Sequence, residues 1–476
     1  VEPNDATAKA QVVAIPAYVE GRIFAAAAPG AIDVDLFRFE ARRGRTLVVE
    51  TEAERRGSPV DTKIEILTPD GRPVPRLLLQ AVRDSYITFR GIDSNSDQAR
   101  LFNWEEMELN QYLYLSGEVC KFFRKPQGPD SGFQFYLSGG KRRGYFDTTS
   151  TAHALDEPAY VVEPHPVGAT LVNNGLPTYV LPYVNDDDAR RKLGADSRLS
   201  FTPPADGTYL VRVVDVRGFG GDNFDYRLSI REPKPDFTVA ISKTDLTVGL
   251  GSAAGLSFTA ERKDDFEGPI TIDVRNLPPG YSMSTPLTIE AGHDTARAVL
   301  AVDADAKPVD AAVWKKVELS ATAPIGERDV VRPIAGLTRV TLEPKPKLLV
   351  RLEPAEVTIA PGRTVSAMLK AERNAFTERG AFDVSNLPHG VIVDNIGLNG
   401  ILIPEGQTER QIFLTADAWV PETDRTFFAE TKTPRAGGGK VEFEASGAVV
   451  LKVRKPAALA EAGESKAAPP PTAATK

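Results

Sequence analysis

The sequence predicts an all-β protein, and three observations carry that prediction. Short segments alternate apolar with small or polar residues, as in Phe237-Thr238-Val239-Ala240-Ile241, which is the period of a half-buried strand. Turn signals such as Asn-Leu-Pro-x-Gly and Pro-Asp-Gly separate these segments. The 38 glycines and 37 prolines favour many turns over long helices. A length of 476 residues suggests about three domains.

The clearest organising feature is an internal repeat. The segment Glu232-Pro233-Lys234-Pro235 recurs 111 residues later as Glu343-Pro344-Lys345-Pro346. Further landmarks follow at slowly drifting offsets, among them Gly251 with Gly362 and the turn that begins at Asn276 with the turn that begins at Asn386. Drifting offsets with retained landmarks are expected from two copies of one domain whose loops differ in length.

Each copy has the size and strand pattern of an immunoglobulin-like sandwich, although the Cys…Trp…Cys hallmark of antibody domains is absent. The sequence therefore predicts two tandem Ig-like β-sandwiches at 232–343 and 344–455, with a late strand at 441–445. The two Glu-Pro-Lys-Pro segments are expected to be stiff junctions, because a residue before proline favours extended backbone. The Ala/Pro/Lys-rich stretch 456–476 is predicted to be a disordered tail.

Residues 1–231 are predicted to form another β-sandwich with a β-rich insertion at about 76–200. Strand patterns occur at 45–51, 64–67, 209–213 and 226–230. Four segments resemble, in order, the bacterial pre-peptidase C-terminal domain: the opening Glu2-Pro3-Asn4-Asp5, the strand 33–39, the hairpin 57–71, and the closing Phe201-to-Tyr209 strand. The resemblance implies a jelly-roll-like sandwich and an exported protein, and the insertion is where the chain departs from that family.

A calcium site is implied by the same resemblance. Collagen-binding domains of secreted bacterial collagenases share this fold and hold calcium with an acidic N-terminal segment folded against a strand. Hard cations prefer carboxylate and carbonyl oxygens. The alternative is that Asp33 caps a turn and that the N-terminus is only solvated. Carried over by position, the predicted calcium ligands are Glu2, Asn4, Asp5, Asp33 and Asp35.

No catalytic motif emerges, so the chain is not expected to be an enzyme. The four histidines His153, His165, His293 and His389 show no zinc-ligand spacing. Asp147 and His153 flank a hydroxyl-rich stretch, but closeness in sequence does not establish the contact that a nucleophile and its base require. The single cysteine, Cys120, excludes an intrachain disulfide and is expected to be a small buried residue.

The insertion is rich in aromatic and basic residues, which are the usual anchors of protein and glycan interfaces. The favoured alternative is that these residues build the insertion's own core. The candidate interface residues are Tyr112, Tyr114, Phe135, Tyr136, Arg142, Arg143 and Tyr145.

Charge and composition narrow the function classes. A net charge of −8 argues against a nucleic-acid surface, and no apolar run is long enough to span a membrane. A first residue Val1 without methionine fits an exported protein whose leader was removed, or a fragment. We expect a non-catalytic binding or scaffold protein that is secreted, periplasmic or on the cell surface, calcium-stabilised and able to form homo-oligomers, with a protein or glycan partner. The alternative is the accessory region of a secreted protease or other hydrolase.

Overall fold

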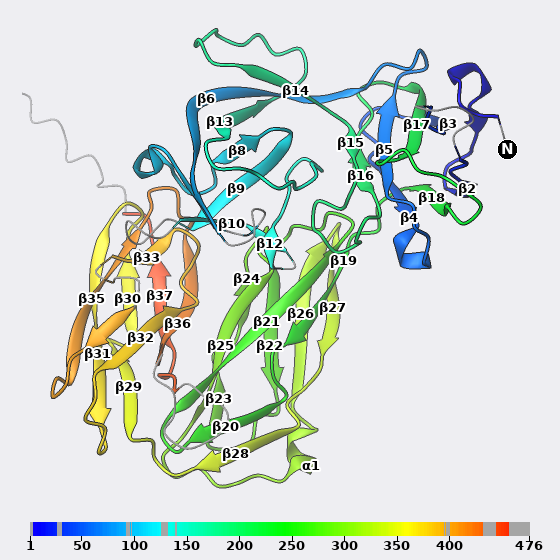
Figure 1. The fold of residues 1–476 in the computed structure, drawn as a ribbon. Coiled ribbons are helices and arrows are strands. Elements are labelled where there is room, and N and C mark those ends of the chain that lie inside the picture. The colour runs from blue at the N-terminus through cyan, green and yellow to red at the C-terminus, as the bar shows by residue number, and fades with distance from the viewer. Residues whose placement is uncertain are drawn as a thin grey trace, which may run out of the picture. The chain divides into compact units, whose positions relative to one another are not determined.

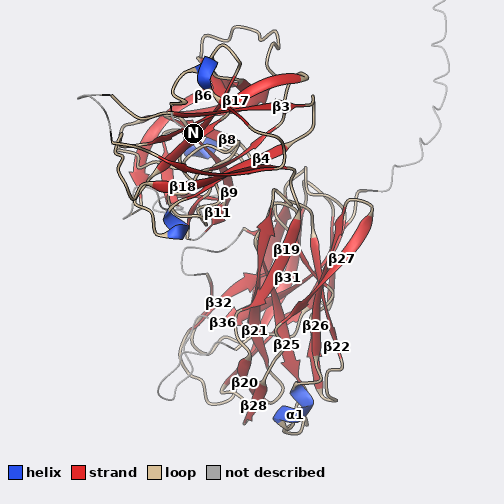
Figure 2. Ribbon diagram, turned by 90° about the vertical axis from the view of Figure 1, so that its right-hand side faces the viewer, coloured by secondary structure: helices blue, strands red, loops and turns tan. Residues whose placement is uncertain are grey.

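The computed structural model describes residues 3–25, 31–91, 96, 98–124, 132–138, 140–394, 396, 400–431 and 444–456. The predicted tail after Pro456 and most of the predicted strand at 441–445 lie outside these residues. The chain forms two compact units, Val1–Phe237 with Arg262–Glu267, and Thr238–Glu261 with Gly268–Lys476. Each unit is described by itself below. Strands dominate both units and the helices are short, which confirms the all-β prediction (Figure 2).

Two sheets form the sandwich of the first unit. One has the strand order β1-β3-β17-β5-β15 and the other β16-β4-β18-β2 (Figure 1). The sandwich core lies between them, because alternate residues of each strand are apolar and buried; Phe39, Phe201 and Tyr209 pack there ring against ring. The strands are β1 (Gln11–Val12), β2 (Ala17–Arg22), β3 (Asp35–Ala41), β4 (Leu47–Glu52), β5 (Thr62–Leu67), β15 (Val184–Asn185), β16 (Arg198–Phe201), β17 (Gly207–Asp215) and β18 (Asp225–Arg231).

The insertion folds as a closed β-barrel, whose strands we call the ring of strands. Hydrogen bonding runs β6-β7-β10-β9-β8-β13 and back to β6, and β14 pairs with β6 outside the ring. Closure leaves no free edge within the ring. Short elements complete the insertion: the 3₁₀ turn η3 (Trp104–Glu106), β11 (Leu137–Ser138) and β12 (Lys141–Arg142). The ring and its appended strand are β6 (Pro75–Arg90), β7 (Gln98–Leu101), β8 (Tyr112–Leu115), β9 (Glu118–Arg124), β10 (Phe133–Phe135), β13 (Pro158–His165) and β14 (Thr178–Pro182).

The insertion ends at Pro182, whereas the sequence predicted an end near 200. The reason is that the next strands belong to the sandwich. Val184 and Asn185 pair with β5, and β16 pairs with β4. The segment 184–201 therefore supplies one edge strand to each sandwich sheet.

The second unit contains the strands of the two predicted Ig-like modules except Asp236–Phe237 and Arg262–Lys263, which belong to the first unit. The strands of the two modules correspond in order, except that the described part of the second module has no counterpart of α1 or β27. In each module the second strand pairs in parallel with the last, β20 with β28 and β30 with β37. The first module has β19 (Asp236–Ile241), β20 (Asp245–Gly249), β21 (Ala253–Lys263), β22 (Ile270–Arg275), β23 (Tyr281–Met283), β24 (Leu287–Ile289), β25 (Thr295–Val302), α1 (Ala311–Trp314), β26 (Glu318–Ile325), β27 (Arg328–Ile334) and β28 (Arg339–Glu343). The second has β29 (Leu348–Glu353), β30 (Glu356–Ile359), β31 (Thr364–Arg373), β32 (Gly380–Ser385), β33 (Val391–Val393), β34 (Ile401–Ile403), β35 (Glu409–Ala416), β36 (Thr423–Thr431) and β37 (Val449–Val453).

The backbone conformation of the Asn-Leu-Pro-x-Gly turn explains why the same residue types recur in both modules. Asn276 and Asn386 have φ angles of 62° and 68°, and the closing Gly280 and Gly390 have 82° and 87°. Asparagine and glycine tolerate this left-handed region best. The Asn386 side-chain amide also donates to the Thr426 carbonyl oxygen at 2.7 Å. The turn therefore needs these residue types in both copies.

The two modules are joined by more than their linker. Ala253 of the first module and Ala445 of the second exchange two backbone hydrogen bonds, of 3.2 and 2.9 Å. These two alanines, with Val299 and Phe428, form a small buried core shared between the modules. Arg297 of the first module also pairs with Glu430 of the second at 2.7 Å. The sequence predicted stiff junctions only; the structure adds a packed interface.

Candidate functional site

Two of the predicted calcium ligands, Asp33 and Asp35, accept hydrogen bonds from other parts of the sandwich. Asp35 is 2% exposed, and its Oδ2 accepts a hydrogen bond from the hydroxyl of the buried Tyr226 at 2.5 Å. The Asp33 carboxylate accepts a hydrogen bond from the backbone N–H of Phe24 at 2.6 Å. Both contacts hold the polypeptide together, and the contact of Asp33 joins it to Phe24, nine residues earlier in the chain.

The described members of the predicted calcium set are not gathered into one group. Asn4 is buried and Asp5 is exposed. Across the part of the chain that the structure describes, no three Asp, Glu, His or Cys side chains are placed to hold a metal ion. Asp5, Asp33 and Asp35 therefore do not form the expected cluster. Glu2 lies outside the described residues, so the five-residue set stays a prediction.

A buried ionic cluster lies in the insertion and was not foreseen from the sequence. Glu118, on β9, is fully buried, and its two carboxylate oxygens accept from Arg142 Nε at 2.7 Å and Nη2 at 2.8 Å. His153 Nε2 lies 2.8 Å from the same carboxylate, and its Nδ1 lies 2.7 Å from Glu157. Burial opposes ionisation of Glu118, yet the hydrogen bonds from His153 and Arg142 lower its pKa to about 2.

Cys120 also belongs to this cluster. Cys120 Sγ lies 3.0 Å from Glu118 Oε1. Burial, followed by the nearby Glu118 charge, raises the pKa of the Cys120 thiol, so the thiolate is disfavoured. Asp147 is held elsewhere, by Arg76 Nη1 at 2.5 Å and the Ser200 N–H at 3.0 Å. His153 and Asp147 are therefore engaged with different partners.

Most of the predicted interface residues are in the interior. Phe135, Tyr136, Arg142 and Arg143 are 1 to 8% exposed, so they are corrected to core or buried ion-pair positions, as the alternative had it. A buried side chain is not available to a surface partner. Tyr112, Tyr114 and Tyr145 are half-buried against a second cluster on the outer side of the ring.

The exposed aromatic residues of the insertion lie instead on β6 and just after β7. The rings of Tyr86 and Phe102 stack with centroids 4.9 Å apart and an angle of 15° between them. Tyr86 is 37% exposed, Phe102 is 47% exposed, and the nearby Phe89 is 37% exposed. We call Tyr86, Phe89 and Phe102 the aromatic platform. In the sequence these three residues give a weaker signal than the dense aromatic stretch at 112–146, because polar and aliphatic residues separate them.

Hydrogen bonds fix the backbone that carries the platform. The Phe102 N–H donates to the Tyr86 carbonyl oxygen at 3.0 Å, and the Ser85 hydroxyl donates to the Phe102 carbonyl oxygen at 2.6 Å. The Arg100 guanidinium lies 5.7 Å from the Phe89 ring centre. These hydrogen bonds hold together the two backbone segments that carry Tyr86 and Phe102.

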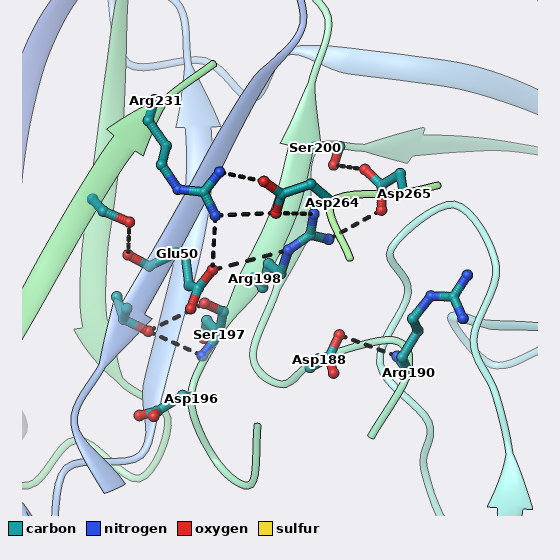
Figure 3. Close-up of polar contacts among 12 residues, drawn as sticks. Glu50, Asp188, Arg190, Asp196, Ser197, Arg198, Ser200, Arg231, Asp264 and Asp265 are labelled. Carbon is teal, nitrogen blue, oxygen red and sulfur yellow. Dashed lines mark hydrogen bonds and ion pairs between the residues drawn. The ribbon is translucent and has the colours of Figure 1, made fainter. Parts of the chain in front are cut away.

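A second polar cluster fixes Arg262–Glu267 within the first unit (Figure 3). Arg231 pairs with Asp264 at 2.5 Å, and Arg198 reaches Asp265 at 3.2 Å. Burial opposes ionisation of both aspartates, but the arginines lower the pKa of each. Because cationic and anionic groups are matched here, we assign this network to structure.

The segment 185–188 contains the Asp187 carboxyl group, whose ionised form is disfavoured by burial and by neighbouring negative charges. Burial, with the charges of Asp186 and Asp61, raises the pKa of Asp187 to about 6. A folded-state pKa above the unfolded value means that ionisation costs stability as the pH rises from about 4 to 6.

We therefore expect Asp187→Asn to stabilise the first unit at pH 7.5. Half-exposure screens the charge, so the gain should be roughly 1 kcal/mol, or about 2–4 °C in Tm. Thermal unfolding at pH 7.5 and pH 4 checks this, with exposed Asp222→Asn as the control. A gain of equal size at both pH values would show that the charge is not its cause.

Comparisons with known proteins found only distant structural similarity, which carries no argument about the fold. No protein-family model and no curated protein matches the chain, so the resemblance to the pre-peptidase C-terminal domain stays a prediction. Among solved structures, the D0-D1 domain of intimin is 11% identical, covering 45% of this chain and 97% of its own, with a TM-score of 0.17. Domains 4 and 5 of the S-layer protein SbsC are 15% identical, covering 39% and 75%, with a TM-score of 0.16. Similarity at this level carries no argument about function.

The described residues contain no helix long and apolar enough to cross a membrane.

Proposed function

We propose that this protein is a non-catalytic binding protein of the cell surface or extracellular space, and that the aromatic platform is its binding surface. The observation that carries the proposal is the exposed, stacked pair of Tyr86, on β6, and Phe102, just after β7. Large aromatic side chains are normally withdrawn from water, and exposed ones in a group mark interaction sites.

The remaining architecture supports a scaffold role. The insertion is carried by the sandwich through the two continuous connections at Pro75 and Pro182. The Ig-like modules share a buried core and backbone hydrogen bonds, so they are packed against each other and not connected by the linker alone. Stiff β-sandwich pairs suit the display of a binding element.

Binding to isolated cell-envelope fractions tests this proposal. The intact chain is expected to sediment with the fractions, and Tyr86→Leu with Phe102→Leu is expected to weaken this about tenfold, since each ring contributes about 0.7 kcal/mol more than leucine would. Leucine keeps the side chains apolar and similar in bulk, so folding is preserved. The matched control is Tyr18→Leu, which changes an exposed tyrosine of the sandwich strand β2. Equal binding by the platform variant and the wild type would contradict the proposal.

A further inference from the structure

We infer that the ligand of the aromatic platform is a neutral carbohydrate chain, an inference that rests on the proposed function. The Tyr86 and Phe102 rings lie nearly parallel with centroids 4.9 Å apart, so each covers part of one face of the other, and the rest of both side chains is partly exposed to solvent. One face of a pyranose ring presents mostly C–H groups, while its hydroxyl groups project around the rim. Such a face packs on an aromatic ring, whose negative π face attracts the weakly positive C–H groups.

The size of the platform favours a short stretch of sugar chain over a folded protein. Aromatic side chains have about 200 Å² of surface each, so the exposed parts of its three rings amount to roughly 250 Å². Each partner in a stable protein–protein interface buries about 800 Å². The platform therefore covers well under half of such an interface, which suits a ligand much smaller than a folded protein.

The polar groups near the platform are mixed in sign. Asp84 is exposed two residues before Tyr86 on the same strand, and Arg100 lies beside Phe89. Arg83 and Glu106 pair with each other at 3.4 Å. Sugar hydroxyl groups both donate and accept hydrogen bonds, so they suit a carboxylate and a guanidinium at one site. A polyanion would instead need a large excess of positive charge, whereas Arg83 is paired and only Arg90 and Arg100 stand against Asp84 here.

The half-buried tyrosines extend the platform along the outer side of the ring. Tyr160, on β13, lies opposite Asp84 on one side and opposite Tyr114 on the other. Tyr114 stacks on Tyr179 of β14 with ring centres 4.1 Å apart. Phenolic hydroxyl groups donate and accept hydrogen bonds, as sugar hydroxyls require. A row of this kind suits an extended chain lying across strands β6, β13 and β8.

The test uses the intact chain and envelope fractions treated in two ways. Protease digestion removes protein partners, and periodate oxidation cleaves the vicinal diols of sugars. We expect binding to survive protease and to be lost after periodate. In native gels that contain β-glucan, xylan or galactomannan, at least one of these neutral polysaccharides is expected to retard the wild type. The Tyr86→Leu/Phe102→Leu variant should need about tenfold more of it for equal retardation, and Tyr18→Leu should behave as the wild type.

The outcomes separate the two claims. Binding that is lost after protease, survives periodate and still depends on Tyr86 and Phe102 would overturn the carbohydrate inference and leave the proposed function standing. Retardation that is the same for the wild type and the platform variant would also overturn the inference. Absence of any binding to untreated fractions would overturn the proposed function itself. Thermal unfolding of each variant confirms that losses do not come from unfolding.

Discussion

Replacing Glu118 by glutamine is expected to destabilise the first unit by about 3–5 kcal/mol. The change leaves the Arg142 guanidinium, 4% exposed, without its bidentate carboxylate partner inside the ring of strands. A buried charge that has lost its counter-ion suffers the full cost of desolvation. His153 loses the same partner, so the effect is spread over the whole cluster.

Chemical denaturation of the intact chain measures this, with Glu163→Gln as the matched control. Glu163 lies on β13 of the same sheet, but it is exposed. The pH dependence adds a second readout. The folded-state pKa of Glu118, about 2, lies below the unfolded value, so its stabilisation is present above about pH 4.5 and is lost as the pH falls towards 2. A Glu118→Gln effect no larger than that of Glu163→Gln would refute the structural role of the ion pair.

Replacing Phe428 by alanine is expected to cost about 3–5 kcal/mol and to uncouple the two Ig-like modules. Phe428 is fully buried in the small core that it shares with Val299 of the first module, and Arg297 of that module lies 5.7 Å from its ring centre. Removal of the ring leaves a cavity at the contact between modules. The two modules should then unfold in separate steps where the wild type unfolds them together.

Differential scanning calorimetry of the intact chain resolves these transitions. The control is Phe413→Ala, which removes a phenylalanine that is 38% exposed on β35 of the second module. It should cost much less and leave the modules coupled. If Phe428→Ala lowered the melting temperature without separating the transitions, the shared core would not be what couples the modules.

The sequence was most informative where structure is set by local chemistry. The Asn-Leu-Pro-x-Gly turn requires left-handed backbone at its asparagine and glycine, so its recurrence located equivalent strands in both modules. The alternating strand at 237–241 was likewise found where predicted, as β19. Such features depend on a few neighbouring residues, and a single sequence records them directly.

Contacts between distant residues could not be predicted in this way. Glu118 meets Arg142 and His153 because β9 turns that carboxylate into the ring, which depends on strand register. The pairing of Ala253 with Ala445 joins two domains through residues without any sequence signal. The predicted interface was largely wrong for the same reason. The aromatic composition pointed to the insertion, but only the pairing of its strands shows that Phe135 faces inward and Tyr86 outward.

Amide hydrogen exchange of the intact chain, measured with and without a ligand, tests the proposed binding surface most directly because it shows which segments the ligand protects. The probe is the neutral polysaccharide that most strongly retards the wild type, or the solubilised envelope fraction if none does. The account predicts added protection in peptides that span 84–90 and 100–104, with little change in the Ig-like modules. Protection confined to those modules, with none on the insertion, would contradict the claim that the aromatic platform is the binding surface.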